Sequence, residues 1–390
     1  MQVTICGGGN AAHVLAGLLG ARQDLQVNVY TPLNDEAQRW QQGIQAGGGI
    51  TLTSHEGILV GQPYRVSADP AAVIPGSKVV ILALPAFAHE LILRDIVPYL
   101  GEQAWLGALP ARGGFDWSVE HILMARNTSM VIFGLQTLPW ACRIQQYGRE
   151  VAILGTKAQV DLAAWPSSYA GEVAALLADL MDVYVCPIAN FLSLTLANTG
   201  QLIHPGVMYG LFQDWHGQLY TEAPLFYQGV NATTADILQQ LSGEVQALRR
   251  ILERYHPDLD LSAVRPLDEW LRRSYAEDIL DASSLQSSFS TNRSYAGLRA
   301  PMRPLGDGWV PDFQARYLAE DVPYGLIVIR GIAELADLPT PMMDRVIAWA
   351  QMRLGKEYLV GGKLNGGSLA TSRAPQRYGI RTLDGVVRRA

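Results

Sequence analysis

Three consecutive glycines near the start of the chain have the spacing of a phosphate-binding turn. Gly7, Gly8 and Gly9 follow the apolar run Val3–Cys6 and precede a segment in which apolar residues recur at helical spacing. The first glycine permits a tight turn. The third lets a pyrophosphate approach the N-terminus of the helix, whose free N–H groups and dipole favour an anion. The pattern predicts a dinucleotide site at Gly7, Gly8, Gly9, Asn10, Ala11 and Ala12.

The residues after the second predicted strand bear on which dinucleotide binds. An acidic residue there usually bonds the ribose 2′-hydroxyl of NAD, whereas NADP needs a nearby Arg or Lys. Thr31 occupies this position, Asp35 and Glu36 follow it, and the first basic residue is Arg39. Because two carboxylates would repel a 2′-phosphate, the sequence favours NADH over NADPH. Thr31 and Pro85, at two strand ends, complete the predicted cofactor residues.

Three ionisable residues in the second half of the chain could perform acid–base chemistry on a carboxylate substrate. His204 lies in an apolar helical segment, and Arg316 is followed five residues later by Asp321. An imidazole held by a carboxylate transfers protons near neutral pH, and the planar fork of an arginine fits a carboxylate. Each residue also has a structural interpretation: His204 could be a packed core residue, and Asp321 could cap the helix that Pro323 begins.

A third segment with polar residues follows the predicted strand 130–133. Ligands of open α/β sheets bind at the carboxyl ends of the strands, which is where this segment begins. Gln136, Thr137 and Arg143 could therefore hold a substrate carboxylate.

The elements that must position these residues change character along the chain. Strands and helices alternate up to about residue 187, which indicates a doubly wound parallel sheet, and a hairpin at 141–156 is expected to extend it. Helical spacing then dominates, apart from a long loop at 281–311. The sequence predicts an N-terminal Rossmann-type α/β domain, 1–187, followed by an all-α domain, 188–390. The predicted helices are 11–19, 34–45, 89–100, 117–125, 190–215, 228–254, 323–336, 341–354 and 383–388.

Composition narrows the class of protein. The chain has 390 residues and a net charge of −6, which argues against nucleic acid as a partner. It has no run of about 18 apolar residues that would cross a membrane and no signal-peptide pattern at its start. Cys6, Cys142 and Cys186 lack the spacing of a metal site, so we expect reduced thiols, no metal and a cytoplasmic protein.

Several segments together resemble one known family, the opine dehydrogenases of the octopine and nopaline dehydrogenase type. The matching segments are GGGNAAH at 7–13, TPLNDEAQRW at 31–40, TLPWACR at 137–143, NTGQLIHP at 198–205 and RYLAEDVPYGL at 316–326. The resemblance covers nearly the whole chain. It implies a Rossmann domain followed by a helical domain, and condensation of an amino acid with a 2-oxo acid, usually pyruvate, through an imine that NAD(P)H reduces. By the same resemblance His204 is the catalytic histidine, Asp321 its dyad partner, and Arg316 the residue that holds a substrate carboxylate.

Two other functions remain open at this stage. A dehydrogenase of the same architecture could reduce the ketone of a 2-hydroxy acid precursor, but most such sites use a lysine, and the second half of the chain has only Lys356 and Lys363. The chain could also be a non-catalytic NAD(H)-binding protein. The amino acid substrate is not determined, although a basic one would need an acidic partner, for which the candidates are Asp214, Glu222, Asp268 and Glu269. A monomer or a homodimer is expected.

Overall fold

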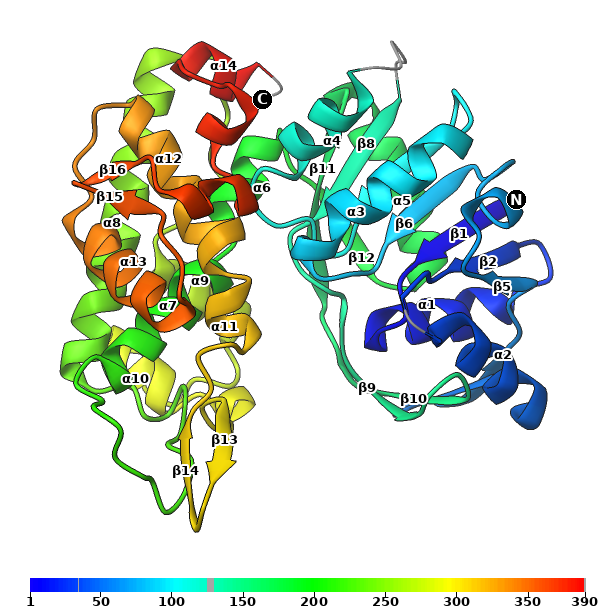
Figure 1. The fold of residues 1–390 in the computed structure, drawn as a ribbon, viewed down its shortest axis with the longest axis horizontal. Coiled ribbons are helices and arrows are strands. Elements are labelled where there is room, and N and C mark those ends of the chain that lie inside the picture. Colours follow the sequence, from blue (N-terminus) through cyan, green and yellow to red (C-terminus); the bar gives the residue numbers. More distant parts are fainter. Residues whose placement is uncertain (34, 125–129, 389–390) are drawn as a thin grey trace. The chain divides into compact units, whose positions relative to one another are not determined.

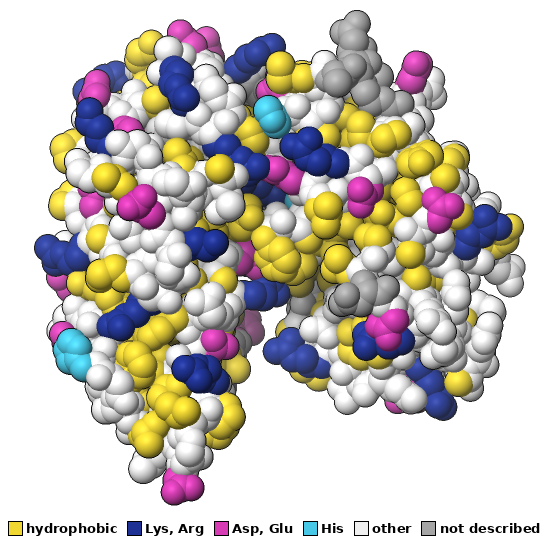
Figure 2. Space-filling view, in the orientation of Figure 1, with side chains coloured by type: hydrophobic (Ala, Val, Ile, Leu, Met, Phe, Trp, Pro, Cys, Tyr) yellow, Lys and Arg dark blue, Asp and Glu magenta, His cyan; other side chains and the backbone are white. Residues whose placement is uncertain are grey.

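The computed structural model describes residues 1–33, 35–124 and 130–388, and it divides into two compact units, Met1–Leu194 and Thr195–Arg388 (Figure 1). The predicted start of one helix at residue 34 and the predicted end of another at residue 125 lie outside the described residues. Within the described ranges, no helix is both long and apolar enough to span a membrane. On the face drawn in Figure 2, basic and acidic side chains are interspersed over each unit.

The first unit is built on a sheet whose neighbouring strands pair in parallel, except that β8 and β11 are antiparallel. The chain moves outward from β1 through β2, then returns to the other side of β1 with β6, so β1 and β6 flank a topological switch point. Ligands bind at such points, beyond the carboxyl ends of the strands. Across the described residues the spatial order is β12 (Tyr184–Pro187), β11 (Gln159–Trp165), β8 (Val131–Leu135), β7 (Trp105–Ala108), β6 (Val79–Leu82), β1 (Gln2–Cys6), β2 (Gln26–Tyr30) and β5 (Arg65–Ser67).

Helices cover both faces of this sheet (Figure 1). The side chains of a strand alternate between the two faces, so apolar strands such as these place apolar side chains on both faces, and both must be buried. Val3 and Ile5 of β1 enter one apolar core, and Cys6 enters the other. The first core is closed by α1 (Asn10–Gly20), α2 (Glu36–Gly47) and α5 (Ala170–Met181), and the second by α3 (Ala86–Ile96) and α4 (Phe115–Leu123). The predicted doubly wound α/β architecture is confirmed.

A second, smaller sheet packs against α1. Its order is β4 (Gly57–Gly61), β3 (Ile50–Ser54), β10 (Glu150–Thr156) and β9 (Trp140–Gln146). The hairpin predicted at 141–156 forms as β9 and β10, but the prediction that it extends the doubly wound sheet is wrong. β10 instead pairs with β3, because the position beside β8 is occupied by β11.

The second unit is mainly helical, as predicted, with two short antiparallel hairpins added. Its long helix α8 begins at an N-cap, where the side chain of Asn231 accepts a hydrogen bond from the amide of Thr234. The predicted loop 281–311 is wrong in part, because it contains a short helix and both strands of one hairpin. The described elements are α7 (Gly200–Phe212), α8 (Ala232–Tyr255), α9 (Leu267–Ser274), α10 (Leu285–Ser290), β13 (Met302–Leu305), β14 (Gly308–Pro311), α11 (Arg316–Ala319), a π-helical turn (Val322–Leu326), α12 (Ile327–Leu335), α13 (Pro341–Leu354), β15 (Leu359–Val360), β16 (Lys363–Leu364) and α14 (Leu383–Val387). The remaining helix α6 (Phe191–Ala197) contains the boundary between the units.

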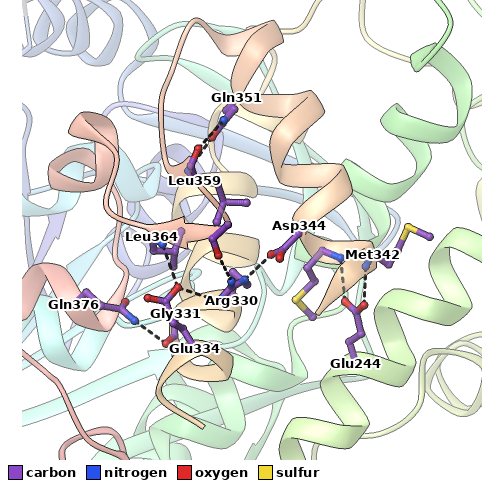
Figure 3. A network of polar contacts seen from close by, with 12 residues as sticks. Glu244, Arg330, Gly331, Glu334, Met342, Asp344, Gln351, Leu359, Leu364 and Gln376 are labelled. Carbon is purple, nitrogen blue, oxygen red and sulfur yellow. Dashed lines mark hydrogen bonds and ion pairs between the residues drawn. The ribbon is translucent and has the colours of Figure 1, made fainter. Parts of the chain in front are cut away.

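A buried arginine connects α12, α13 and the C-terminal segment of the second unit (Figure 3). The guanidinium of Arg330 donates to the carboxylates of Asp344 and Glu334 and, at 2.9 Å, to the backbone carbonyl of Gly362. The Arg330 side chain is only 8% exposed. Nearby, Glu244 of α8 accepts hydrogen bonds from the first amides of α13, those of Met342 and Met343.

We therefore expect Arg330→Ala to lower the free energy of unfolding by about 2–4 kcal/mol, because it leaves two partly buried carboxylates without their cation. Urea unfolding followed by circular dichroism measures this change. Arg272→Ala is the matched control, since Arg272 pairs with Asp268 on an exposed helix surface and should cost no more than about 0.5 kcal/mol. Equal losses in the two variants would contradict a stabilising role for the buried network.

Candidate active site

The first and third glycines of the N-terminal turn differ in their surroundings, since protein atoms crowd Gly7 but not Gly9. Gly7 has a φ of +135°, and a Cβ there would lie 2.6 Å from the carbonyl oxygen of Ala83, so the fold itself requires glycine. A Cβ on Gly9 would meet no protein atom within 4 Å. Gly9 is the N-cap of α1, and no side chain caps the first amides of that helix. Open space beside uncapped amides fits a pyrophosphate group.

The residues that follow the glycines attach the turn to the small sheet. The side-chain oxygen of Asn10 accepts a hydrogen bond of 2.8 Å from the amide of Ile144 in β9. His13 is fully buried, and its Nε2 atom accepts a 2.8 Å hydrogen bond from the amide of Gly148, at the β9–β10 turn. Burial lowers the pKa of His13 to about 4, so the ring is neutral at pH 7 and serves as a structural link.

An acidic side chain does lie beside the glycine turn, although it is not the residue at the strand end. The hydroxyl of Thr31, which is buried, donates a hydrogen bond to Oε2 of Glu36. A Cβ on Gly8 would lie 2.3 Å from that same oxygen, so the Glu36 carboxylate contacts the turn. The sequence points to Asp35 and Glu36 together as the carboxylates near this position. The structure shows that Glu36 is the one that contacts the turn, which the spacing past the strand does not reveal.

The loop after β6 borders the turn on its other side. Ala83 lies against Gly7, and Pro85 is the N-cap of α3 and partly buried. The predicted cofactor residues Gly7, Gly9 and Pro85 therefore lie at the carboxyl ends of β1 and β6, at the switch point of the sheet.

In the second unit, the structure brings His204 and Asp321 into contact. Nδ1 of His204 lies 2.8 Å from Oδ2 of Asp321, within hydrogen-bond distance. The side chain of Asp321 is 1% exposed and that of His204 is 19% exposed, so the imidazole retains access to solvent while the carboxylate does not. A buried carboxylate that accepts from Nδ1–H fixes the tautomer of the ring and leaves the lone pair on Nε2.

Two irregular helices produce this contact across a separation of 117 residues. His204 lies in α7, immediately before Pro205, and Asp321 is the N-cap of the π-helical turn Val322–Leu326. A Cβ on Gly325 would lie 2.3 Å from the Cβ of Gln201, so a glycine allows the turn to approach α7 closely. π-helical turns occur frequently at functional sites because they redirect side chains within a helix.

Two tyrosines that the sequence analysis did not identify complete the surroundings of His204. The ring of Tyr317 stacks on the imidazole with centroids 4.1 Å apart and an interplanar angle of 12°. The hydroxyl of Tyr227 lies 3.1 Å from Nε2 of His204. Tyr317 follows Arg316 directly, so its position within a matching segment was a usable signal. Tyr227 has no such signal, because only the folded chain brings it to His204.

Arg316 begins α11, one turn before the dyad carboxylate. Its Nε donates a 2.6 Å hydrogen bond to Oε2 of Glu320, whose side chain is 1% exposed, whereas the Arg316 side chain is 57% exposed. Glu320 thus anchors the guanidinium on one edge, and the exposed group remains able to meet a carboxylate ligand.

The other predicted substrate residues lie in the first unit. Gln136 and Thr137 follow β8 directly, and Thr137 accepts a hydrogen bond of 2.9 Å from Nζ of Lys157. Arg143 is exposed on β9 and donates to the backbone of Cys142, so it belongs to the small sheet. Most of the acidic candidates are paired with arginines: Glu222 with Arg299, Asp268 with Arg272, and Glu269 with Arg265.

The fold and these two groups of residues define a dinucleotide-dependent dehydrogenase with a Rossmann-type unit and a helical unit. Comparison with known proteins agrees. Residues 187–354 match the family described as NAD/NADP octopine/nopaline dehydrogenase, alpha-helical domain. Octopine dehydrogenase of Mizuhopecten yessoensis is 38% identical to the chain, over 99% of the chain and 98% of that protein. Tauropine dehydrogenase of Arabella iricolor is 35% identical over 99% of both.

A solved structure of octopine dehydrogenase with NADH and L-arginine superposes with a TM-score of 0.92 at 37% identity, over 99% of this chain and 97% of that one. The chain belongs to the opine dehydrogenase family, of the octopine and nopaline dehydrogenase type. The fold class and the enzyme class predicted from the sequence are confirmed.

The hydrogen bond between His204 and Asp321 predicts how variants of the pair behave. Asp321→Asn should lower kcat by about 10²–10⁴-fold, because an amide can donate to Nδ1 and so favour the tautomer with its proton on Nε2. Steady-state kinetics with NADH would measure this loss. Asp236→Asn, which changes an exposed carboxylate on α8, is the control and should leave kcat unchanged.

The double variant His204→Ala with Asp321→Asn should be little slower than the slower single variant, because the two side chains act as one unit. Losses that multiply would show that the two residues act independently.

Proposed function

We propose that the chain is an NADH-dependent opine dehydrogenase. It condenses the amino group of an amino acid with a 2-oxo acid, for which we propose pyruvate, and reduces the resulting imine. The observation that carries this proposal is the hydrogen bond between His204 and Asp321. Asp321 lies five residues after Arg316, and all three residues belong to segments typical of the family. The relatives support the choice of substrates, since octopine dehydrogenase has been solved with NADH and L-arginine and with NADH and pyruvate.

Imine formation needs a group that takes up and returns protons. The attacking amine loses protons, and the carbonyl oxygen leaves as water. His204 can accept a proton at Nε2 and return it to the departing hydroxyl, while Asp321 stays ionised and stabilises the imidazolium. Arg316 holds a substrate carboxylate and so orients the carbonyl carbon or the amine. When bound, NADH supplies the hydride that reduces the imine.

The cofactor choice rests on the residues around the glycine turn. Gly7, Gly8 and Gly9, with the backbone of Asn10, Ala11 and Ala12, would hold the pyrophosphate at the uncapped N-terminus of α1. The Glu36 carboxylate, which Thr31 holds against Gly8, would accept hydrogen bonds from a ribose and repel a 2′-phosphate. Pro85 would contact the cofactor from the loop after β6.

The remaining assignments complete the proposal. Residues 1–187 bind the cofactor and 188–390 the substrates, with Gln136, Thr137 and Arg143 as further candidates for the second carboxylate. The enzyme is cytoplasmic, in keeping with its free cysteines, and a monomer or a homodimer.

The direct test is an assay of NADH oxidation with pyruvate and a panel of amino acids that includes arginine and taurine. We expect turnover only when an amine is present. Oxidation with the 2-oxo acid alone would indicate a hydroxy acid dehydrogenase, and binding of NADH without turnover would indicate a regulatory protein.

Gly9→Val should weaken NADH binding by more than about tenfold, or 1.4 kcal/mol, because the branched side chain would occupy the space reserved for the phosphates. The variant should fold normally, since a Cβ at this position meets no protein atom. Fluorescence titration with NADH measures the affinity, and a melting curve serves as the control. Unchanged affinity would contradict the cofactor site, and tighter binding of NADPH than of NADH would contradict the choice of cofactor.

Arg316→Lys should raise KM for one of the two substrates by about tenfold or more, because lysine keeps the charge beside Glu320 but loses the planar fork. KM values for both substrates, each measured at saturation of the other, identify the carboxylate concerned. Arg272→Lys, on an exposed helix, is the control. Wild-type KM values for both substrates in Arg316→Lys would exclude a bidentate contact.

A further inference from the structure

The nitrogen of His204 that must exchange protons with substrate is already hydrogen-bonded by a second side chain. Asp321 accepts from Nδ1–H, so Nε2 of the neutral ring carries the lone pair. The hydroxyl of Tyr227 lies 3.1 Å from Nε2. Burial holds the pKa of Tyr227 well above its usual range, so the phenol is protonated at neutral pH. Tyr227 therefore donates to Nε2, and the bonds run in one direction from Tyr227 through His204 to Asp321.

The ring of Tyr227 is fixed by its aromatic neighbours. It stacks on Tyr295, with centroids 4.1 Å apart and an interplanar angle of 18°, and it lies parallel to Phe289, with centroids 6.3 Å apart. Phe226 packs against it edge-on at 4.8 Å. Moving the hydroxyl away from Nε2 would require the ring to leave this stack and lose its aromatic contacts.

The Tyr227 hydroxyl lies on the path of any proton that moves between the substrate and Nε2 of His204. Because the Tyr227 hydroxyl is hydrogen-bonded to Nε2, a proton that leaves the substrate amine for His204 would pass through the phenolic oxygen. Hydroxyl groups transfer protons in this way without acquiring a net charge.

We propose that Tyr227 relays protons between the substrate and His204. In the step, the amine N–H bond breaks and its proton bonds to the phenolic oxygen, as the phenol's own proton passes to Nε2. The electron pair of the N–H bond stays on nitrogen, His204 becomes imidazolium, and Tyr227 ends as a neutral phenol. The reverse step returns a proton to the departing hydroxyl. The relay rests on the proposed function, because it requires His204 to act as the proton-transfer group.

The test compares Tyr227→Phe with Tyr295→Phe. Both variants keep the aromatic stack, but only the first removes the hydroxyl that bonds His204. With the amino acid and 2-oxo acid that the wild type uses, we expect Tyr227→Phe to lower kcat by about 10–10²-fold, with NADH affinity unchanged. This is less than the ~10²–10⁴-fold contribution of general acid–base catalysis, because His204 is still present. Tyr295→Phe should keep the wild-type kcat.

A second measurement separates a relay from a merely structural role. The rate in mixtures of H₂O and D₂O should curve with the deuterium fraction in the wild type and in Tyr295→Phe, because two protons move in one step, and should become linear in Tyr227→Phe. Wild-type kcat in folded Tyr227→Phe, or a linear dependence in the wild type itself, would overturn the relay. The proposed function fails separately, if the wild type oxidises no NADH with any amino acid and 2-oxo acid pair.

Discussion

The helical unit depends on one close approach, that of the π-helical turn Val322–Leu326 to α7. Gly325 permits it, because a side chain there would collide with Gln201. The approach places the buried carboxylate of Asp321 on Nδ1 of His204, and from this contact the tautomer of the ring follows. The aromatic residues around His204 then limit how the ring can turn. The contact on which the proposed acid–base chemistry rests is thus a consequence of backbone packing between two irregular helices.

The glycine turn of the first unit is open where the π-helical turn is tightly packed. Among the described residues, no protein atom lies within 4 Å of the position that a Cβ on Gly9 would occupy. Its surroundings are nevertheless well defined: the loop after β6 lies on one side, and the Glu36 carboxylate lies on the other. Thr31 does not need to touch a cofactor to influence binding, since its hydroxyl holds Glu36 in place. A single hydrogen bond between a strand end and the first turn of α2 therefore sets the charge beside the turn.

Much of the architecture could be predicted from the sequence, because strand, turn and helix signals are local. The glycine turn, the parallel sheet and the helical second unit follow from short-range periodicity. Matching segments pointed to His204, Arg316 and Asp321 as candidates, and the structure brings two of them, His204 and Asp321, into contact. What failed depended on long-range pairing. The β9–β10 hairpin was recognised, but its partner strand β3 lies about a hundred residues earlier in the chain. Tyr227 was missed because its contact with His204 appears only when the chain folds.

The links from the small sheet to the glycine turn affect the order in which the chain can fold. Asn10 bonds Ile144, and His13 bonds Gly148, across separations of 134 and 135 residues. Loop-closure entropy makes such distant contacts late events in folding. During synthesis the glycine turn leaves the ribosome well before its supports, which lie 134 and 135 residues further along the chain. A nascent chain that has not yet reached the β9–β10 hairpin therefore holds the glycine turn without these two hydrogen bonds, and a ligand of the turn can stabilise the completed arrangement only after the hairpin has docked.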